Sequence, residues 1–94
     1  MLKSILRTPR FKRDYKALMR KHYDEASFRE ALEALMSENH DLLRSRFRDH
    51  ALKGEWEGFR ELHVEGDWLL IYRIDRDILQ LVLTRTGSHD TLLR

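Results

Sequence analysis

Three histidines, an aspartate and an arginine are the residues of this chain whose types could do chemistry together. His50, His63 and Asp67 lie in one stretch, and Arg85 and His89 lie in a second stretch near the C-terminus. An aspartate or histidine can take a proton, a histidine can return one to a departing oxygen, and an arginine can stabilise charge on a phosphate. These groups suit cleavage of a phosphodiester. In RNA the 2′-hydroxyl is a built-in nucleophile, so this chemistry needs neither a metal nor a covalent enzyme intermediate.

The hydropathy pattern of the C-terminal half predicts the strands that carry these residues. Residues 59–64 alternate between apolar and polar, Glu65-Gly66 is a compact turn, and residues 67–74 return as an antiparallel partner. After a second turn, residues 78–85 form the last long strand.

Strand polarity then predicts that the polar groups converge. In a meander, the end of the last strand lies beside the start of the strand before it. We therefore expect Asp67, Arg85 and His89, together with His63, at one end of the sheet. His50 must come from a strand or loop that approaches the same sheet.

Two helices are predicted before these strands. Residues 2–7 are expected to form an edge strand. Thr8-Pro9 then predicts the start of a helix, with Thr8 as N-cap and proline at the first helical position. The first helix covers residues 9–21, and its apolar stripe is Phe11, Tyr15, Leu18 and Met19.

The second helix is capped by Asp24 or by Ser27, which with Glu30 also fits a capping box, and it ends near Glu38. Its apolar stripe is Phe28, Ala31, Leu32, Leu35 and Met36. Residues 39–48 are expected to be a loop that tucks its apolar side chains over the core. The resulting order βααβββ is an α+β fold, with an antiparallel helical hairpin on the sheet.

Composition limits the class of protein. Ninety-four residues predict one domain over residues 1–94, with 41% hydrophobic and 36% charged side chains. The chain has no cysteine, so it has no disulfide, thiolate nucleophile or thiolate zinc site. It has no signal-peptide pattern, and its longest apolar run, residues 68–72, is too short to cross a bilayer. We expect a cytoplasmic protein with no membrane contact.

The charge is divided unevenly along the chain. Residues 1–23 carry eight lysines and arginines against one acid, Asp14, for a net charge of +7, while the remaining residues sum to −5. Such a basic segment can attract a polyanion such as RNA. The alternative is a solvated helix face that pairs with the acids downstream.

Each candidate has a plainer alternative. A histidine at a strand end is usually a hydrogen-bonded surface residue, and three histidines with an aspartate could bind zinc. Their spacing fits no known metal motif, so neither a metal nor a cofactor is expected. Trp68 could stack on a base at the rim of the sheet or pack in the core. Arg60 could contact substrate or form an ion pair.

Residues 49–73, followed by the motif LTRTGSH, resemble the YafQ branch of the RelE/ParE superfamily, the toxin halves of bacterial type II toxin–antitoxin pairs. The resemblance implies a microbial-RNase-like fold, with two helices on a twisted antiparallel sheet. It also implies an endoribonuclease that cleaves mRNA in the A site of the 70S ribosome. A cognate antitoxin would inhibit it, and the toxin would be a monomer alone and part of a heterotetramer with antitoxin.

The resemblance also implies roles for the residues. Asp67 matches the general base, His89 the general acid and Arg85 the group that stabilises the scissile phosphate, while His50 and His63 orient substrate or share charge. Substrate contacts are expected from Trp68, Lys53 and Arg60. Leu93 replaces an aromatic residue of the family pattern, which weakens base stacking there and could change the rate or the codon preference.

Two other functions remain open at this point. A ParE-like toxin would poison DNA gyrase by binding and would need the fold but not the histidines. A catalytically inactive interaction module would bind only an antitoxin.

Overall fold

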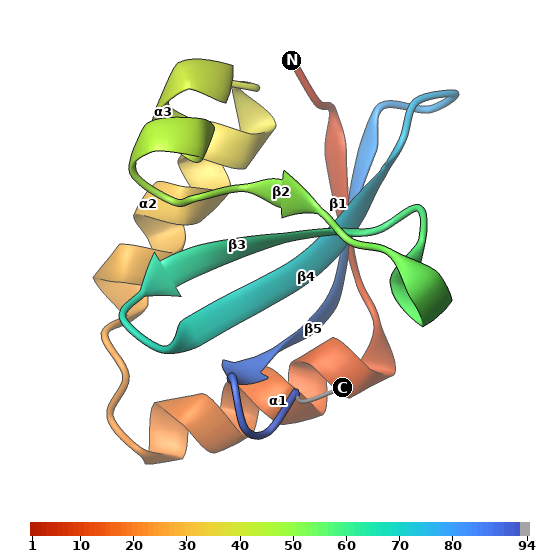
Figure 1. Cartoon of the computed structure of the whole chain (residues 1–94). Helices are drawn as coiled ribbons and strands as arrows, with labels where there is room; N and C mark the ends of the chain where they lie inside the picture. The colour runs from red at the N-terminus through yellow and green to blue at the C-terminus, as the bar shows by residue number, and fades with distance from the viewer. Residues whose placement is uncertain (93–94) are drawn as a thin grey trace.

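The computed structural model describes residues 1–92 and contains three α-helices and a five-stranded sheet (Figure 1). The elements follow one another as β1 (Ser4–Arg7), α1 (Pro9–Arg20), α2 (Glu25–Met36), α3 (His40–Ser45), β2 (His50–Ala51), the 3-10 turn η1 (Gly54–Trp56), β3 (Arg60–Glu65), β4 (Trp68–Asp75) and β5 (Gln80–Ser88). The α+β class predicted from the sequence is confirmed.

The strands lie in the order β1-β5-β4-β3-β2. The pairs β2–β3, β3–β4 and β4–β5 are antiparallel, whereas β1 and β5 are parallel. The predicted antiparallel sheet is therefore present in β2 to β5, and the edge strand β1, whose direction was not predicted, adds one parallel pair. Parallel neighbours need a long crossover between them, and the helices together with β2 to β4 provide one here.

The predicted start of the first helix is confirmed. Thr8 is the N-cap of α1, and its hydroxyl accepts a hydrogen bond from the backbone N–H of Phe11 at 3.0 Å. Pro9 occupies the first helical position, where its missing N–H leaves no hydrogen bond unmade. Phe11 and Leu18 from the predicted stripe are buried.

Of the two predicted caps for the second helix, Asp24 is the one used. Its carboxylate accepts from the backbone N–H of Ala26 at 2.9 Å. Ser27 lies inside α2 instead, and its hydroxyl donates to Oε1 of Glu65 at 2.6 Å. This bond ties α2 to the end of β3.

The helices α1 and α2 run in different directions in Figure 1, α1 along the bottom of the view and α2 up its left side, and do not lie side by side as the helices of a regular antiparallel hairpin would. They meet through aromatic rings. The Phe28 ring centroid lies 5.9 Å from that of Phe11 and 5.1 Å from that of Tyr15. These contacts join both helices to the core that covers one face of the sheet.

Residues 39–48 contain a helix that the sequence did not predict. Asn39 caps α3, and its side chain accepts from the backbone N–H of Leu42 at 3.2 Å. Leu43 and Phe47 are buried, so the expectation that this segment covers the core is confirmed. A helix of six residues is too short to leave a 3.6-residue period in the sequence.

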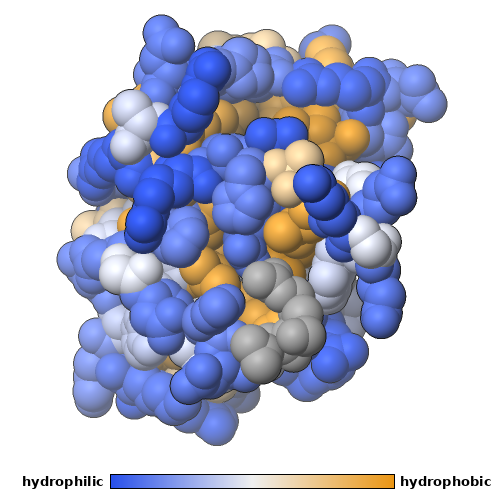
Figure 2. All heavy atoms as spheres, in the orientation of Figure 1, coloured by the Kyte–Doolittle hydropathy of each residue, from blue (hydrophilic) through white to orange (hydrophobic). Residues whose placement is uncertain are grey.

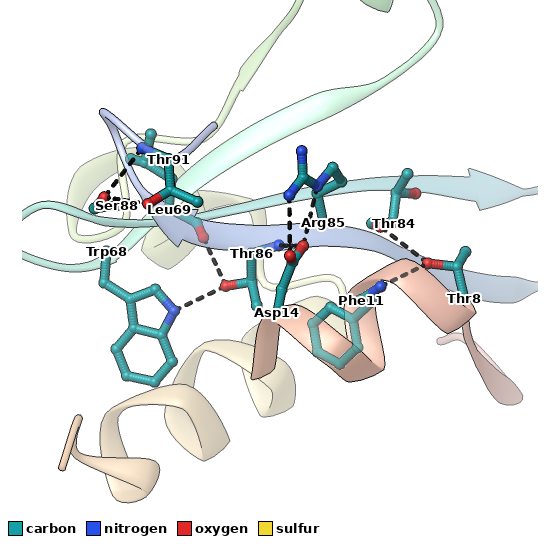
Figure 3. Close-up of polar contacts among 10 residues, drawn as sticks. All are labelled: Thr8, Phe11, Asp14, Trp68, Leu69, Thr84, Arg85, Thr86, Ser88 and Thr91. Atoms are coloured by element: carbon teal, nitrogen blue, oxygen red, sulfur yellow. Dashed lines mark hydrogen bonds and ion pairs between the residues drawn. The ribbon is translucent and has the colours of Figure 1, made fainter. Parts of the chain in front are cut away.

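Trp68 lies in the core and not at the rim. It is 1% exposed and packs edge-on against Tyr23 and face-on against Phe28. Its indole N–H donates to the hydroxyl of Thr86 at 2.8 Å, and that hydroxyl donates to the carbonyl of Leu69 at 2.7 Å (Figure 3). The expectation that Trp68 stacks on a base is therefore wrong for this conformation, because neither ring face is accessible.

An extra residue in β5 changes which side chains face the core. Ile71 pairs with Arg85 but the next residue, Tyr72, pairs with Leu83, so Thr84 has no cross-strand partner. Tyr72 and Leu83 belong to the core under the helices, whereas Ile71 belongs to a smaller cluster. Neighbouring residues of a strand face opposite sides. Arg85 therefore shares the outer face of the sheet with Ile71.

The buried bond between Trp68 and Thr86 gives a stability prediction. Thr86→Val keeps the shape of the side chain but leaves the indole N–H without an acceptor, so we expect a loss of about 1–3 kcal/mol in the free energy of unfolding. Urea denaturation measures it. Thr84→Val is the matched control, because Thr84 is half-buried and its hydroxyl donates only to the nearby carbonyl of Val82. Equal losses in the two variants would contradict the role given to this bond.

Candidate active site

A row of side chains crosses the outer face of the sheet from β2 to β5. His50 pairs with Glu61, Glu61 with Ile71, and Ile71 with Arg85. Directly paired residues of antiparallel strands project to the same side. Strands are spaced about 4.8 Å apart, so three spacings separate the Cα atoms of His50 and Arg85 by about 14 Å. His63 lies two residues beyond Glu61 and faces the same side.

The floor of this face is apolar. Leu69, Ile71 and Leu92 are buried there, and the half-buried Trp56 and Phe59 pack against them. Figure 2 shows hydrophobic side chains in a band over the sheet, bordered by hydrophilic residues. The charged and polar groups of the row therefore stand beside a small apolar cluster whose less buried members are Trp56 and Phe59.

Asp67 and His89 meet at one end of the sheet. Trp68 pairs with Ser88 across β4 and β5, so the residues on either side of this pair come next to each other. The backbone N–H of His89 donates to Oδ1 of Asp67 at 3.3 Å, and both residues are exposed. This is the approach that strand polarity predicted. Arg85 lies on the outer face of the same half of β5.

His50 and His63 form a second group, with ring centroids 6.5 Å apart. Arg48 connects them. Its carbonyl oxygen lies 2.9 Å from Nδ1 of His50, and its Nη2 lies 3.2 Å from Nδ1 of His63. Nε2 of His50 lies 3.4 Å from the carboxylate of Glu61, which is 4% exposed.

These contacts assign the ring protons. A guanidinium can only donate, so Nδ1 of His63 accepts from Arg48 and the ring carries its hydrogen on Nε2. A carbonyl can only accept, so Nδ1 of His50 carries a hydrogen. The two histidines are therefore held in different protonation patterns by the same residue.

Arg85 is paired with a residue from the first helix. Its Nε and Nη2 donate to the two carboxylate oxygens of Asp14 at 3.0 and 2.9 Å. The Arg85 and Asp14 side chains are 17% and 12% exposed. Hydrogen bonding to Asp14 raises the pKa of Arg85, against the opposing effect of burial. The charge of Arg85 is thus already compensated within the protein.

The two other predicted substrate contacts, Lys53 and Arg60, differ in their surroundings. Lys53 is exposed immediately before η1. Arg60 forms the ion pair given as its alternative, with Nε 2.8 Å from Oδ1 of Asp49. The other oxygen of Asp49 accepts from the hydroxyl of Tyr72, and burial together with this bond raises the pKa of Tyr72. Leu93 lies outside the described residues.

Sequence reasoning did not single out Arg48, Glu61 and Asp14. The alternation of residues 59–64 already places Glu61 on the side of His63, and Asp14 is the single acid of the basic first quarter. Both were signals that the sequence contained. Arg48 left no such signal, because its role depends on a left-handed backbone with φ of 52°.

Within residues 1–92, no group of three or more histidine, aspartate or glutamate side chains is arranged to hold a metal ion. Across the same residues, no helix has the length and apolar character needed to cross a membrane.

The protonation patterns can be tested by nitrogen NMR of the histidine rings. We expect a hydrogen on Nδ1 of His50 and an unprotonated Nδ1 with a hydrogen on Nε2 of His63. In Arg48→Met the constraint on His63 is lost while that on His50 stays, because the carbonyl at position 48 remains. His40, exposed at the start of α3, is the internal reference. A hydrogen on Nδ1 of His63 in the unaltered protein would contradict the assignment.

Comparison with known proteins places this geometry in a family. The sequence model described as "Bacterial toxin of type II toxin-antitoxin system, YafQ" matches residues 3–94. The mRNA interferase toxin YafQ of Escherichia coli K12 is 35% identical over 82 residues, which cover 87% of this chain and 86% of the relative.

Solved structures have a similar fold. YafQ from E. coli strain BL21(DE3) superposes with a TM-score of 0.85 at 30% identity, covering 100% of both chains. A chain of the E. coli DinJ–YafQ complex gives a TM-score of 0.82 at 32% identity, again covering 100% of both chains. On the family match and these similarities, the chain belongs to the YafQ family of bacterial toxins of type II toxin–antitoxin systems.

Proposed function

We propose that this protein is a ribosome-dependent endoribonuclease that cleaves mRNA in the A site by acid–base catalysis, and that a cognate antitoxin inhibits it. The relative in E. coli is named an mRNA interferase toxin. The observation that carries the proposal is the contact between Asp67 and His89 at the end of the sheet face that presents Arg85, His50 and His63.

The proposed reaction needs one base, one acid and one phosphate-binding cation. Asp67 takes the proton of the 2′-hydroxyl, and that oxygen attacks the phosphorus while the bond to the 5′-oxygen breaks. His89 gives a proton to the departing 5′-oxygen. The products are a 2′,3′-cyclic phosphate and a 5′-hydroxyl. Arg85 stabilises the charge on the non-bridging oxygens, and no metal takes part.

The two histidines linked by Arg48 suit a different role. His50 and His63 stand about two to three strand spacings from Arg85 across the sheet and form a group of their own around Arg48. We assign them to orienting the mRNA through a phosphate or base next to the cleavage site. Lys53, which is exposed beside η1, would extend this contact. Arg60 pairs with Tyr72 and so faces the helix side of the sheet, away from this contact.

Binding to the ribosome is assigned to α1. Five exposed basic residues cover the outside of this helix: Arg10, Lys12, Arg13, Lys16 and Arg20. Lysine and arginine contacts to phosphates release counterions, so this interaction weakens steeply as salt rises. The basic helix would dock on ribosomal RNA by such contacts.

The regulatory partner follows from the solved E. coli complexes of DinJ with YafQ. We propose that this chain is monomeric alone, forms a heterotetramer with its own antitoxin, and acts in the cytoplasm, where ribosomes are found.

Removing the base or the acid tests the reaction. We expect Asp67→Ala and His89→Ala each to lower the rate of mRNA cleavage on programmed ribosomes by about 10²–10⁴-fold, because each removes one proton-transfer group. Primer extension measures the cuts. Asp77→Ala and His40→Ala are the matched controls, since these exposed residues lie outside the site. Cleavage by both test variants at the rate of the controls would overturn the assignment.

The same assay separates this proposal from its alternative. A ParE-like toxin that binds DNA gyrase would arrest growth and leave no codon-phased cuts in the mRNA of arrested cells. We expect cuts in phase with codons and unchanged supercoiling of plasmid DNA. Growth arrest without cuts, but with relaxed plasmid, would favour gyrase. Binding of antitoxin with neither effect would indicate an inactive interaction module.

A further inference from the structure

The carboxylate of Asp14 accepts three hydrogen bonds, two from the guanidinium of Arg85 and one from the backbone of Thr86. Oδ1 accepts from Nη2 of Arg85, and Oδ2 accepts from Nε of Arg85 and from the backbone N–H of Thr86 at 3.2 Å. Both charged side chains are mostly buried between α1 and β5. A carboxylate fixed by a backbone N–H and by two guanidinium nitrogens has little freedom to move, so it also fixes the arginine.

The way in which Asp14 binds leaves a defined part of Arg85 free for a ligand. A guanidinium offers a side-on edge, formed by Nε and Nη2, and an end-on edge, formed by Nη1 and the second hydrogen of Nη2. Asp14 occupies the side-on edge. Figure 3 shows the remaining nitrogen pointing away from Asp14 and from α1. A phosphate that approaches from the outer face would therefore meet the end-on edge.

We propose that Asp14 is a positioning residue of the RNA-cleavage site, which holds Arg85 by its side-on edge so that the end-on edge receives the scissile phosphate. This inference rests on the proposed function. It assigns to the single acid of the basic N-terminal quarter a role other than charge balance on the helix surface.

The charge of Asp14 makes the role testable apart from folding. As a second anion near the phosphate, Asp14 opposes substrate binding while it orients Arg85. Asp14→Asn removes the charge but keeps the size of the side chain. We therefore expect a lower rate at saturating substrate without an increase in KM. A purely structural role predicts a lower melting temperature and unchanged kinetics per folded molecule.

A double-mutant cycle completes the test, using single-turnover cleavage of mRNA on ribosomes with saturating toxin. We expect Asp14→Asn to lower the saturating rate about 10²-fold, as a misplaced catalytic group does. In the Arg85→Ala background the same substitution should have no further effect, because Asp14 acts through Arg85. Asp41→Asn, an exposed helical aspartate paired with Arg44, controls for the loss of one negative charge.

Thermal unfolding of each variant gives the folded fraction to which rates are normalised. Asp14→Glu keeps the carboxylate, and we expect it to recover part of the rate that Asp14→Asn loses. Two results would overturn this inference and leave the proposed function standing. One is a cleavage rate of Asp14→Asn within twofold of that of the unaltered protein, and the other is an equal loss of rate from Asp14→Asn with and without Arg85. If Asp14→Asn does not fold, a Glu variant that folds but cleaves no faster than Arg85→Ala overturns it. Absence of cleavage by the unaltered protein overturns the proposed function as well.

Discussion

The extra residue in β5, Thr84, decides which face of the sheet each later side chain of that strand points to. Leu81 and Leu83 point into the core, and regular alternation would send residue 85 after them. An unpaired arginine in the core would cost several kcal/mol. The bulge reverses the alternation, so Arg85 turns to the outer face and Thr86 takes the inward position. The packing of the core and the orientation of the candidate site thus depend on the same irregularity.

Beyond the end of β1, the helix α1 and its N-cap cover the edge of β5. β1 pairs with β5 only as far as Arg7, so the following backbone groups of β5 have no strand on that side. The hydroxyl of Thr8 donates to the carbonyl of Thr84, and Asp14 accepts the N–H of Thr86 (Figure 3). Side chains of α1 and its N-cap therefore satisfy an edge that would otherwise be open to pairing with another strand. This is why α1 lies close enough to reach Arg85.

Sequence reasoning succeeded where a property is decided locally or by strand polarity. The approach of Asp67 to His89 followed from the direction of neighbouring strands, which a hairpin fixes. It failed for Trp68, whose amphipathic ring suits the rim or the core equally until the buried partner Thr86 is known. It also missed the bond from Asp14 to Arg85, because a contact between residues 71 positions apart leaves no periodic trace.

In the proposed reaction, different charges serve affinity for RNA and chemistry at the phosphate. Arg85 and His50, two of the candidate catalytic groups, each have a carboxylate beside them, Asp14 and Glu61 respectively. These pairs fix orientation, but they add little net positive charge to attract a polyanion. The exposed lysines and arginines of α1 would supply that attraction instead. Because α1 also carries Asp14, in the proposed reaction the helix that docks on ribosomal RNA is the same element that orients Arg85 toward the phosphate.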